Sequence, residues 1–120
     1  MSRVMKINNV LKRIVIDEET GIGITNIIKT SSYSMHIALV NSGSKLRAHY
    51  HRDRDEIYIV LKGYGRLRLG DEYYEVSKDH VAFIPKKTIH GIENIGQEPL
   101  IFVFISIPPF DPVHDRIFIE

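Results

Sequence analysis

The chain has 120 residues, of which 43% are hydrophobic and 26% are charged, and its formal net charge is +1. This length supports one hydrophobic core, so we predict a single domain over residues 1–120. Basic and acidic residues are interspersed, which argues against nucleic acid or a membrane surface as a partner and favours small-molecule ligands. The absence of cysteine excludes disulfides, thiolate metal sites and a cysteine nucleophile.

Neither a secretory signal nor a membrane-spanning segment is predicted. The N-terminal residues are partly basic, but no uninterrupted apolar stretch with a small-residue cleavage site follows them. No apolar run reaches the length that crosses a bilayer. We therefore expect a cytoplasmic protein.

The pattern along the chain predicts many short strands separated by turns and no convincing amphipathic helix. In chain order, the predicted strands cover residues 10–16, 22–28, 33–40, 56–61, 66–69, 72–76, 81–84, 89–95 and 100–107. This spacing of strands and turns is typical of an all-β sandwich or small barrel.

The last predicted strand, LIFVFISI at residues 100–107, is apolar throughout and should be buried on both faces. A core helix would fit its periodicity too, but its β-branched and aromatic residues and the flanking prolines favour a strand. The proline-containing tail after it is too apolar at Ile117, Phe118 and Ile119 to remain free. We expect the tail to lie along its own barrel or along that of a partner, and we expect a homodimer.

The stretch from residue 43 to residue 63, which includes a further ligand-bearing strand, organises the predicted site. His49 and His51 are two residues apart, so on an extended chain both imidazoles leave the same face. Glu56 follows at an odd spacing, and the polar residues 52–55 form a turn that would bring its strand back antiparallel. The carboxylate would then face the histidines across the ladder. With His90 from a distant strand, the sequence predicts a metal site of three imidazoles and one carboxylate.

The first half of this pattern resembles the first motif of the cupin superfamily. That motif has a glycine, five residues, His-x-His, about four residues, a glutamate, six residues and a glycine. Gly43, His49, His51, Glu56 and Gly63 match each of these positions.

The second half resembles the second cupin motif, which is Gly, five residues, Pro-x-Gly, two residues, His, three residues and Asn. Pro85, His90 and Asn94 match, whereas Asp79 and Lys87 replace the two glycines. The backbone at those two turns must therefore avoid positive φ or tolerate it at a modest cost.

The resemblance implies an all-β, double-stranded β-helix (jelly-roll barrel) with one divalent metal ion bound inside one end. Imidazole and carboxylate ligands suit iron, manganese, nickel, cobalt, zinc or copper, so the residues do not select one of them. Four protein ligands leave two positions open on an octahedral ion, enough for a substrate. The alternative is a barrel that lacks the metal and binds an organic ligand through the same polar residues.

Two further side chains are candidates for positioning a substrate. Arg47 precedes His49 by two residues, so strict alternation would point its guanidinium inward, where it would bind a carboxylate or phosphate. An exposed arginine paired with Asp53 or another surface acid is the alternative. Tyr58 follows Glu56 by two residues and should also face the cavity, although an ordinary core tyrosine would fit the same pattern.

The resemblance implies a metal-dependent enzyme acting on a small-molecule substrate, and we lean toward a dioxygenase-type oxidoreductase. A sugar or keto-acid isomerase, a decarboxylase and a lyase are the alternatives among enzymes. A non-catalytic barrel that binds a small ligand is the alternative from another class.

Overall fold

A computed structural model describes residues 2–120 as one short helix and eleven strands. The N-terminal half contains α1 (Ile7–Leu11), β1 (Val15–Ile16), β2 (Gly23–Lys29), β3 (Ser34–Val40), β4 (Lys45–Tyr50) and β5 (Asp55–Lys62). The C-terminal half contains β6 (Tyr64–Leu69), β7 (Glu72–Ser77), β8 (Val81–Ile84), β9 (His90–Asn94), β10 (Leu100–Ile107) and β11 (Ile117–Phe118). Within residues 2–120 the five-residue helix α1 is too short to span a bilayer.

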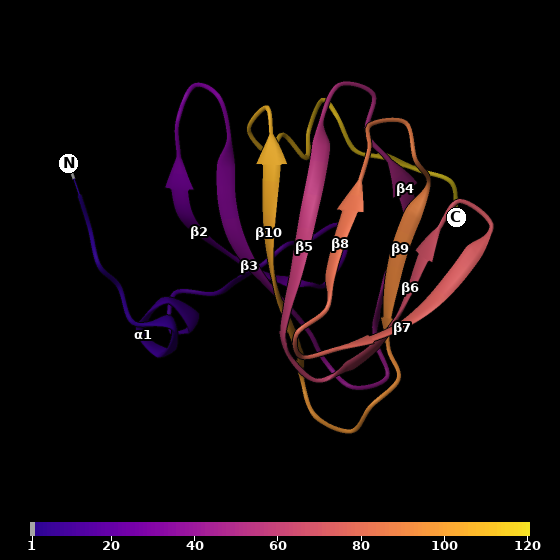
Figure 1. Cartoon of the computed structure of the whole chain (residues 1–120), viewed down its shortest axis with the longest axis horizontal. Helices are drawn as coiled ribbons and strands as arrows, with labels where there is room; N and C mark the ends of the chain where they lie inside the picture. Colours follow the sequence, from indigo (N-terminus) through magenta and orange to yellow (C-terminus); the bar gives the residue numbers. More distant parts are fainter. Residues whose placement is uncertain (1) are drawn as a thin grey trace.

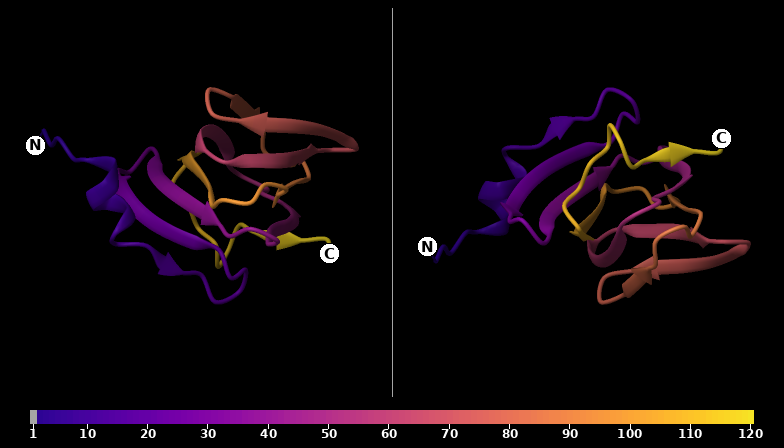
Figure 2. Two further views of the ribbon diagram at one scale, coloured as in Figure 1. Left: turned by 90° about the horizontal axis from the view of Figure 1, so that it is seen from below. Right: turned by 90° about the horizontal axis from the view of Figure 1, so that it is seen from above.

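The strands form two antiparallel sheets (Figure 1), one with the order β1-β2-β3-β10-β5-β8 and the other with the order β11-β4-β9-β6-β7. Figure 2 shows α1 and the C-terminal strand β11 at opposite ends of the molecule. Both sheets place strands that are distant in sequence side by side, as in β3-β10-β5 and β4-β9-β6. The arrangement confirms the predicted all-β, double-stranded β-helix.

The main core lies between the two sheets and is built from one face of each strand. Along β5, burial alternates strictly, with Glu56, Tyr58 and Val60 buried and the residues between them only half-buried. Phe102 of β10 and Ile92 of β9 belong to the same buried cluster, so both sheets contribute to it. The predicted inward face of this strand is therefore confirmed.

The N-terminal prediction was wrong, because residues 10–16 do not form one strand. Val10 belongs to α1 and is buried against Ile37 and Ile101 on the outer face of the larger sheet. Pairing with β2 begins only at Val15 and Ile16, which lie at the sheet edge and remain exposed. Packing of one apolar side chain thus outweighs the β-branched character of the segment.

The C-terminal tail lies along its own barrel, as one of the two predicted alternatives stated. Strand β11 pairs antiparallel with β4, with Phe118 opposite His49 and Ile117 opposite Tyr50. The Ile119 amide continues this ladder by donating to the Ala48 carbonyl at 3.0 Å. The tail therefore covers the edge of the strand that leads to the first two predicted ligands.

Asp79 and Lys87, which replace two motif glycines, both adopt positive φ, at 77° and 71°. The turns therefore keep the left-handed conformation. At each residue this conformation costs about 1 kcal/mol, because Cβ approaches the carbonyl oxygen too closely. At Lys87 the turn is held by its amide, which donates to the His51 carbonyl at 2.6 Å. This bond joins the second motif to the first.

Replacing Lys87 by glycine should stabilise the fold by about 0.5 kcal/mol, because the relieved strain exceeds the added entropy of the unfolded chain. Lys86→Gly is the matched control, since it removes the same charge from the preceding residue, which does not have positive φ. That variant should lose about 0.5–1 kcal/mol. Urea unfolding measures both variants, and equal losses would contradict the argument.

A second buried polar group lies outside the predicted metal site. The His36 ring is 2.7 Å from Asn26 Oδ1 through Nδ1 and 2.7 Å from Ser34 Oγ through Nε2, and it stacks on Phe104. The Phe110 amide donates to the same Ser34 oxygen at 2.8 Å. Burial lowers the pKa of His36 to about 4 from its ordinary value of 6.5. The histidine is therefore a neutral structural link between β2, β3 and the tail.

The fold should lose stability as the pH falls from 6.5 to about 4, because the unfolded chain protonates His36 while the folded chain keeps it neutral. Above pH 6.5 this contribution is fully present. A His36→Gln variant, which does not titrate, should lose about 2 kcal/mol less over this interval. Urea unfolding at several pH values measures the difference. Parallel profiles for the two proteins would contradict the assignment.

Candidate metal centre

The four predicted ligands come from both sheets. His49 on β4 and His90 on β9 are direct cross-strand partners in the smaller sheet, and His51 follows one residue after β4 ends. Glu56 lies on β5 in the larger sheet, where it pairs with Ile84 and Ser106. All four ligand side chains are buried.

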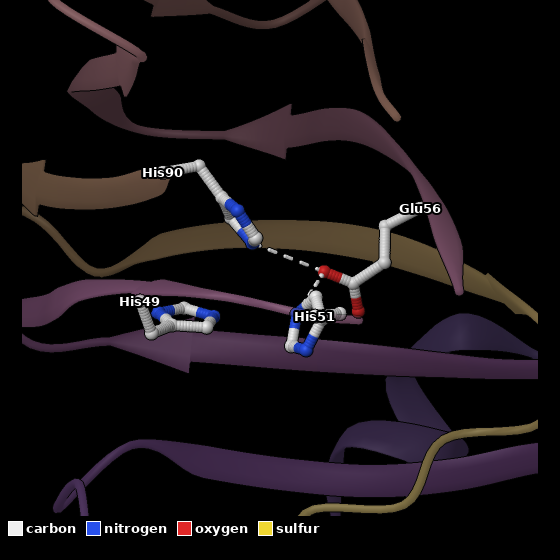
Figure 3. Close-up of side chains that lie close together, drawn as sticks. All are labelled: His49, His51, Glu56 and His90. Atoms are coloured by element: carbon white, nitrogen blue, oxygen red, sulfur yellow. Dashed lines mark hydrogen bonds and ion pairs between the residues drawn. The ribbon is translucent and has the colours of Figure 1, made fainter. Parts of the chain in front are cut away.

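The four side chains converge on one point between the sheets (Figure 3). Each offers one ligand atom, and these atoms lie within 4.8 Å of one another. Glu56 Oε1 is 3.0 Å from His51 Nε2 and 3.2 Å from His90 Nε2. Ligands about 2.1 Å from one ion are at most about 4.2 Å apart, so small side-chain movements suffice to bind a metal.

Glu56 reaches the histidines in a different way from the one predicted. We expected β5 to return beside β4, so that the carboxylate would face the imidazoles across a ladder. The two strands instead belong to different sheets, and residues 51–54 carry the chain from one to the other. Glu56 therefore faces the imidazoles across the core, which makes the site a bridge between the sheets.

Hydrogen bonds to the backbone orient all three imidazoles. The Nδ1 atoms of His49, His51 and His90 lie 2.7, 2.5 and 2.9 Å from the carbonyl oxygens of Arg47, Asp115 and Thr88. A carbonyl can only accept, so each Nδ1 carries the proton. In the neutral rings each Nε2 then presents a lone pair toward the centre, as metal-ligating histidines do.

These lone pairs and the carboxylate repel one another unless a positive species lies among them. Protons on His51 and His90 would place two imidazolium charges side by side and leave the His49 lone pair unused. One divalent cation accepts electron pairs from all four ligand atoms at once. The donor set therefore fits a transition metal ion, and it matches the three imidazoles and one carboxylate predicted from the sequence.

The surroundings keep these groups in the ligating state. Burial lowers the pKa of His49 to about 3, and the neighbouring His90 contributes to the same shift, so its imidazole is neutral. Burial by itself raises the pKa of the Glu56 carboxyl, but the hydrogen bonds and positive charge that His51 and His90 supply when Nε2 is protonated outweigh this effect, and a cation at the same point would act in the same direction. The pKa of Glu56 therefore lies well below its ordinary value, and the side chain is a carboxylate.

A cavity lies beside the four ligands, between the two sheets. It has a volume of about 30 Å³, and its walls are mainly aliphatic and aromatic. The residues that line it are Thr20, Ile22, Ile24, Ala38, Leu46, His49, His51, Arg54, Glu56, Tyr58, Phe102, Phe104, Phe110 and Arg116. Three of the four candidate ligands, His49, His51 and Glu56, thus line this space.

Tyr58 lies in this cavity wall, as the alternation along β5 predicted. Its ring packs on Phe102 at 4.5 Å between centroids and is 6.2 Å from the His90 ring. Burial raises the pKa of the Tyr58 phenol well above its ordinary value, and the Glu56 carboxylate adds to the shift. The phenol stays protonated, so it can donate a hydrogen bond but cannot act as a base near neutral pH. Its substrate-positioning role stays a prediction.

Arg47 does not line the cavity, although alternation along β4 predicted an inward direction. Its guanidinium lies over the Phe118 ring at 4.1 Å and donates to the carbonyls of Glu120 and Glu19 at 3.1 and 3.2 Å. A bulge between Leu46 and His49 breaks the alternation, which explains the different direction. A substrate role for Arg47 stays a prediction, and the structure shows it bound to the tail.

Arg54 is the cavity arginine that the sequence analysis missed. Residues 52–55 were interpreted as a polar turn, yet the Arg54 side chain is only 1% exposed. The alternation that placed Tyr58 in the cavity extends backward through Glu56 to Arg54, so spacing could have identified it. An arginine buried this completely is uncommon and calls for a partner.

Asp115 is another residue of the site that the sequence did not single out. His114 is exposed, whereas Asp115 is 8% exposed and accepts the amides of Arg52 and Asp53 at 2.6 and 3.2 Å. Its own carbonyl accepts the His51 Nδ1 hydrogen. The tail therefore orients both His51 and the loop that carries Arg54. No local motif in the sequence signals this long-range contact.

The sequence is similar to those of known proteins over much of its length. The chain is 44% identical over 85 residues to an uncharacterized protein of Methanocaldococcus jannaschii. The aligned region covers 71% of this chain and 68% of that protein. It is 37% identical over 76 residues to a glucose-6-phosphate isomerase of Pyrococcus furiosus. This aligned region covers 58% of this chain but only 39% of that enzyme.

The fold is also found among solved structures. A Bacillus halodurans protein superposes with a TM-score of 0.78 at 22% identity, over 93% of this chain and 85% of that one. A family model described as the cupin domain matches residues 36–106, a range that contains all four candidate ligands. Since that range is more than half of the chain, the protein belongs to the cupin family.

Proposed function

We propose that this protein is a metal-dependent enzyme that acts on a small organic molecule in the cavity beside His49, His51 and Glu56. The observation that carries the proposal is the meeting of three imidazoles and a buried carboxylate, of which two imidazoles and the carboxylate line that cavity. A divalent ion held by the four ligands would supply a Lewis acid with positions open toward the cavity. A closed structural site would leave no such opening.

Oxidation by dioxygen is the reaction class we favour. Apart from the candidate ligands, the polar residues among the described ones that line the cavity are Thr20, Arg54, Tyr58 and Arg116. None of these side chains is a base near neutral pH, because the tyrosine stays protonated and the arginines are cations. A reaction that needs no protein base suits this cavity better than one that moves a proton between carbons.

The chain's own residues would supply binding and exclusion of water. Tyr58 would donate a hydrogen bond to a substrate oxygen, while Phe102 and Phe104 would keep the reacting groups in an apolar environment. The main-chain carbonyls of Arg47, Thr88 and Asp115 would hold the three imidazoles in one tautomer. These are positioning roles, and none requires a side chain to change its protonation state.

An isomerase is the second candidate, because the chain is 37% identical over 76 residues to the glucose-6-phosphate isomerase of Pyrococcus furiosus. The same Lewis acid would then polarise a carbonyl or hydroxyl oxygen of a sugar or keto acid. This reaction needs a proton carrier in the cavity, which the lining residues do not provide among themselves. A non-catalytic binder would use the cavity without turnover.

A homodimer stays part of the proposal. Strand β8 is an edge of the larger sheet and exposes Val81 and Phe83. Edge strands with exposed apolar side chains favour pairing with a second copy.

Removing one ligand should abolish tight metal binding. In His90→Ala the ion would lose one of four ligands and the affinity should fall by about 100-fold or more, whereas His80→Ala, which removes an exposed imidazole, should bind as the parent does. Elemental analysis of the purified proteins, followed by titration of the stripped proteins with iron, manganese and zinc salts, measures this. Equal metal content in the two variants would rule out the four-ligand site.

The reaction class should be decided by the requirement for oxygen. Metal-loaded protein incubated with a panel of keto acids, diols and phenols should consume dioxygen, and turnover should stop under nitrogen. Product formation without oxygen from a sugar phosphate or keto acid would favour the isomerase. If metal-loaded protein binds a compound tightly and leaves it unchanged under both conditions, it is a binder.

A further inference from the structure

The Arg54 guanidinium is buried beside the candidate metal centre with almost no partners. Its Nε and Nη1 atoms are buried and have no hydrogen-bond acceptor in the described residues. Nη2 lies 3.3 Å from His51 Nε2, and Nε is 3.8 Å from Glu56 Oε2, which is beyond hydrogen-bond distance. An arginine carries five N–H donors and is always charged, so most of its hydrogen-bonding capacity is unused.

Metal binding would remove its one remaining hydrogen bond, and in this respect the inference rests on the proposed function. The His51 lone pair cannot serve both an ion and Arg54. Once that lone pair is committed to a metal, no donor of the guanidinium has an acceptor among residues 2–120. A buried cation without acceptors is strongly unfavourable, so the bound state of the site calls for a further group that accepts these hydrogen bonds.

The position of the Arg54 side chain indicates that the accepting group would lie in the cavity. Phe110 packs against Arg54, with the guanidinium carbon 4.7 Å from the ring centroid, and both residues line the cavity. The donors of a guanidinium lie in its plane, so they remain available at its edges while the ring contacts its face. A ligand in the cavity would contact Arg54 and the open side of the metal together.

The charge of the site selects the sign of the ligand. Arg116, the other cavity arginine, already pairs with Asp17 at 2.9 Å and with Glu19 at 3.2 Å. Glu56 is the one carboxylate among the lining residues, and it would face both a divalent ion and the Arg54 cation. The excess positive charge in this low-dielectric space favours an anion.

We propose that Arg54 is a substrate-binding residue that acts with the metal ion to select a small carboxylate, such as a short 2-oxo acid. A carboxylate accepts two parallel hydrogen bonds from a guanidinium and can place its other groups on the ion. The cavity volume of about 30 Å³ suits a ligand of a few atoms. Its apolar walls would desolvate a tetrahedral phosphate dianion without offering enough donors to it.

The test uses metal-loaded protein with pyruvate, methyl pyruvate and inorganic phosphate as probes in calorimetric titrations. The parent protein should bind pyruvate about 10- to 100-fold more tightly than the neutral ester, and Arg54→Gln should lose that preference while keeping its metal content. Arg52→Gln is the matched control, because it removes the same charge from an exposed residue of the same loop. It should bind pyruvate as the parent does.

The outcomes separate this inference from the proposed function. If the parent fails to bind metal, the metal-dependent function is wrong. If the parent binds metal but binds pyruvate no better than the ester, or if Arg54→Gln binds pyruvate like the parent, the role of Arg54 is overturned. Phosphate binding as tight as that of pyruvate would overturn the choice of a carboxylate. The affinities of the parent protein for pyruvate and methyl pyruvate can be compared even if Arg54→Gln does not fold, so the proposal can still be contradicted.

A stability measurement distinguishes a binding role from a structural one. If Arg54 serves a ligand, metal-loaded Arg54→Gln without pyruvate should unfold at the same temperature as the parent or higher, since it removes a buried cation whose N–H groups lack acceptors. Pyruvate should raise the unfolding temperature of the parent and leave that of the variant unchanged. A marked loss of stability in the variant without ligand would assign Arg54 to the fold instead.

Discussion

Repulsion between three imidazole lone pairs and one buried carboxylate is the constraint on which the rest of the structure depends. The side chains cannot separate, because backbone carbonyls hold the rings from behind and the cross-strand pair of His49 and His90 is part of a ladder. Glu56 approaches from the opposite sheet. A cation at this point would therefore join the two layers of the fold, and its binding free energy would contribute to the stability of the whole barrel.

Residues of the C-terminal tail help to orient the candidate metal ligands, which the sequence did not predict. Asp115 uses its carboxylate to hold the loop after β4 and its main-chain carbonyl to orient His51. Phe118 pairs with His49 and packs 5.5 Å from its ring. The candidate site thus depends on residues more than 60 positions from His49 and His51. The apolar tail is an orienting element for the ligands, which is a stronger reason for its docking than coverage of an exposed edge.

Sequence reasoning succeeded where one strand acts alone and failed where two segments interact. Alternation placed Glu56 and Tyr58 on one face because β5 is regular, and motif spacing identified all four residues of the buried cluster that could hold a metal ion. The same rule gave the wrong direction for Arg47, because a bulge that depends on pairing with β9 interrupts β4. It also missed the helix around Val10, which is decided by distant partners in the core. The single-domain expectation stays a prediction.

The family assignment and the substrate are separate questions in this protein. The four ligands lie within the region that matches the cupin model, and a scaffold of this kind supports different reactions on the same metal. Selectivity must come from the other walls of the cavity, where Arg54 and Phe110 approach from a loop and from the tail. A guanidinium buried there with two of its three nitrogens lacking an acceptor lowers the stability of the empty fold. Such a cost is reasonable at a binding site, where a ligand supplies the missing acceptors, and it has no evident reason in a purely structural core.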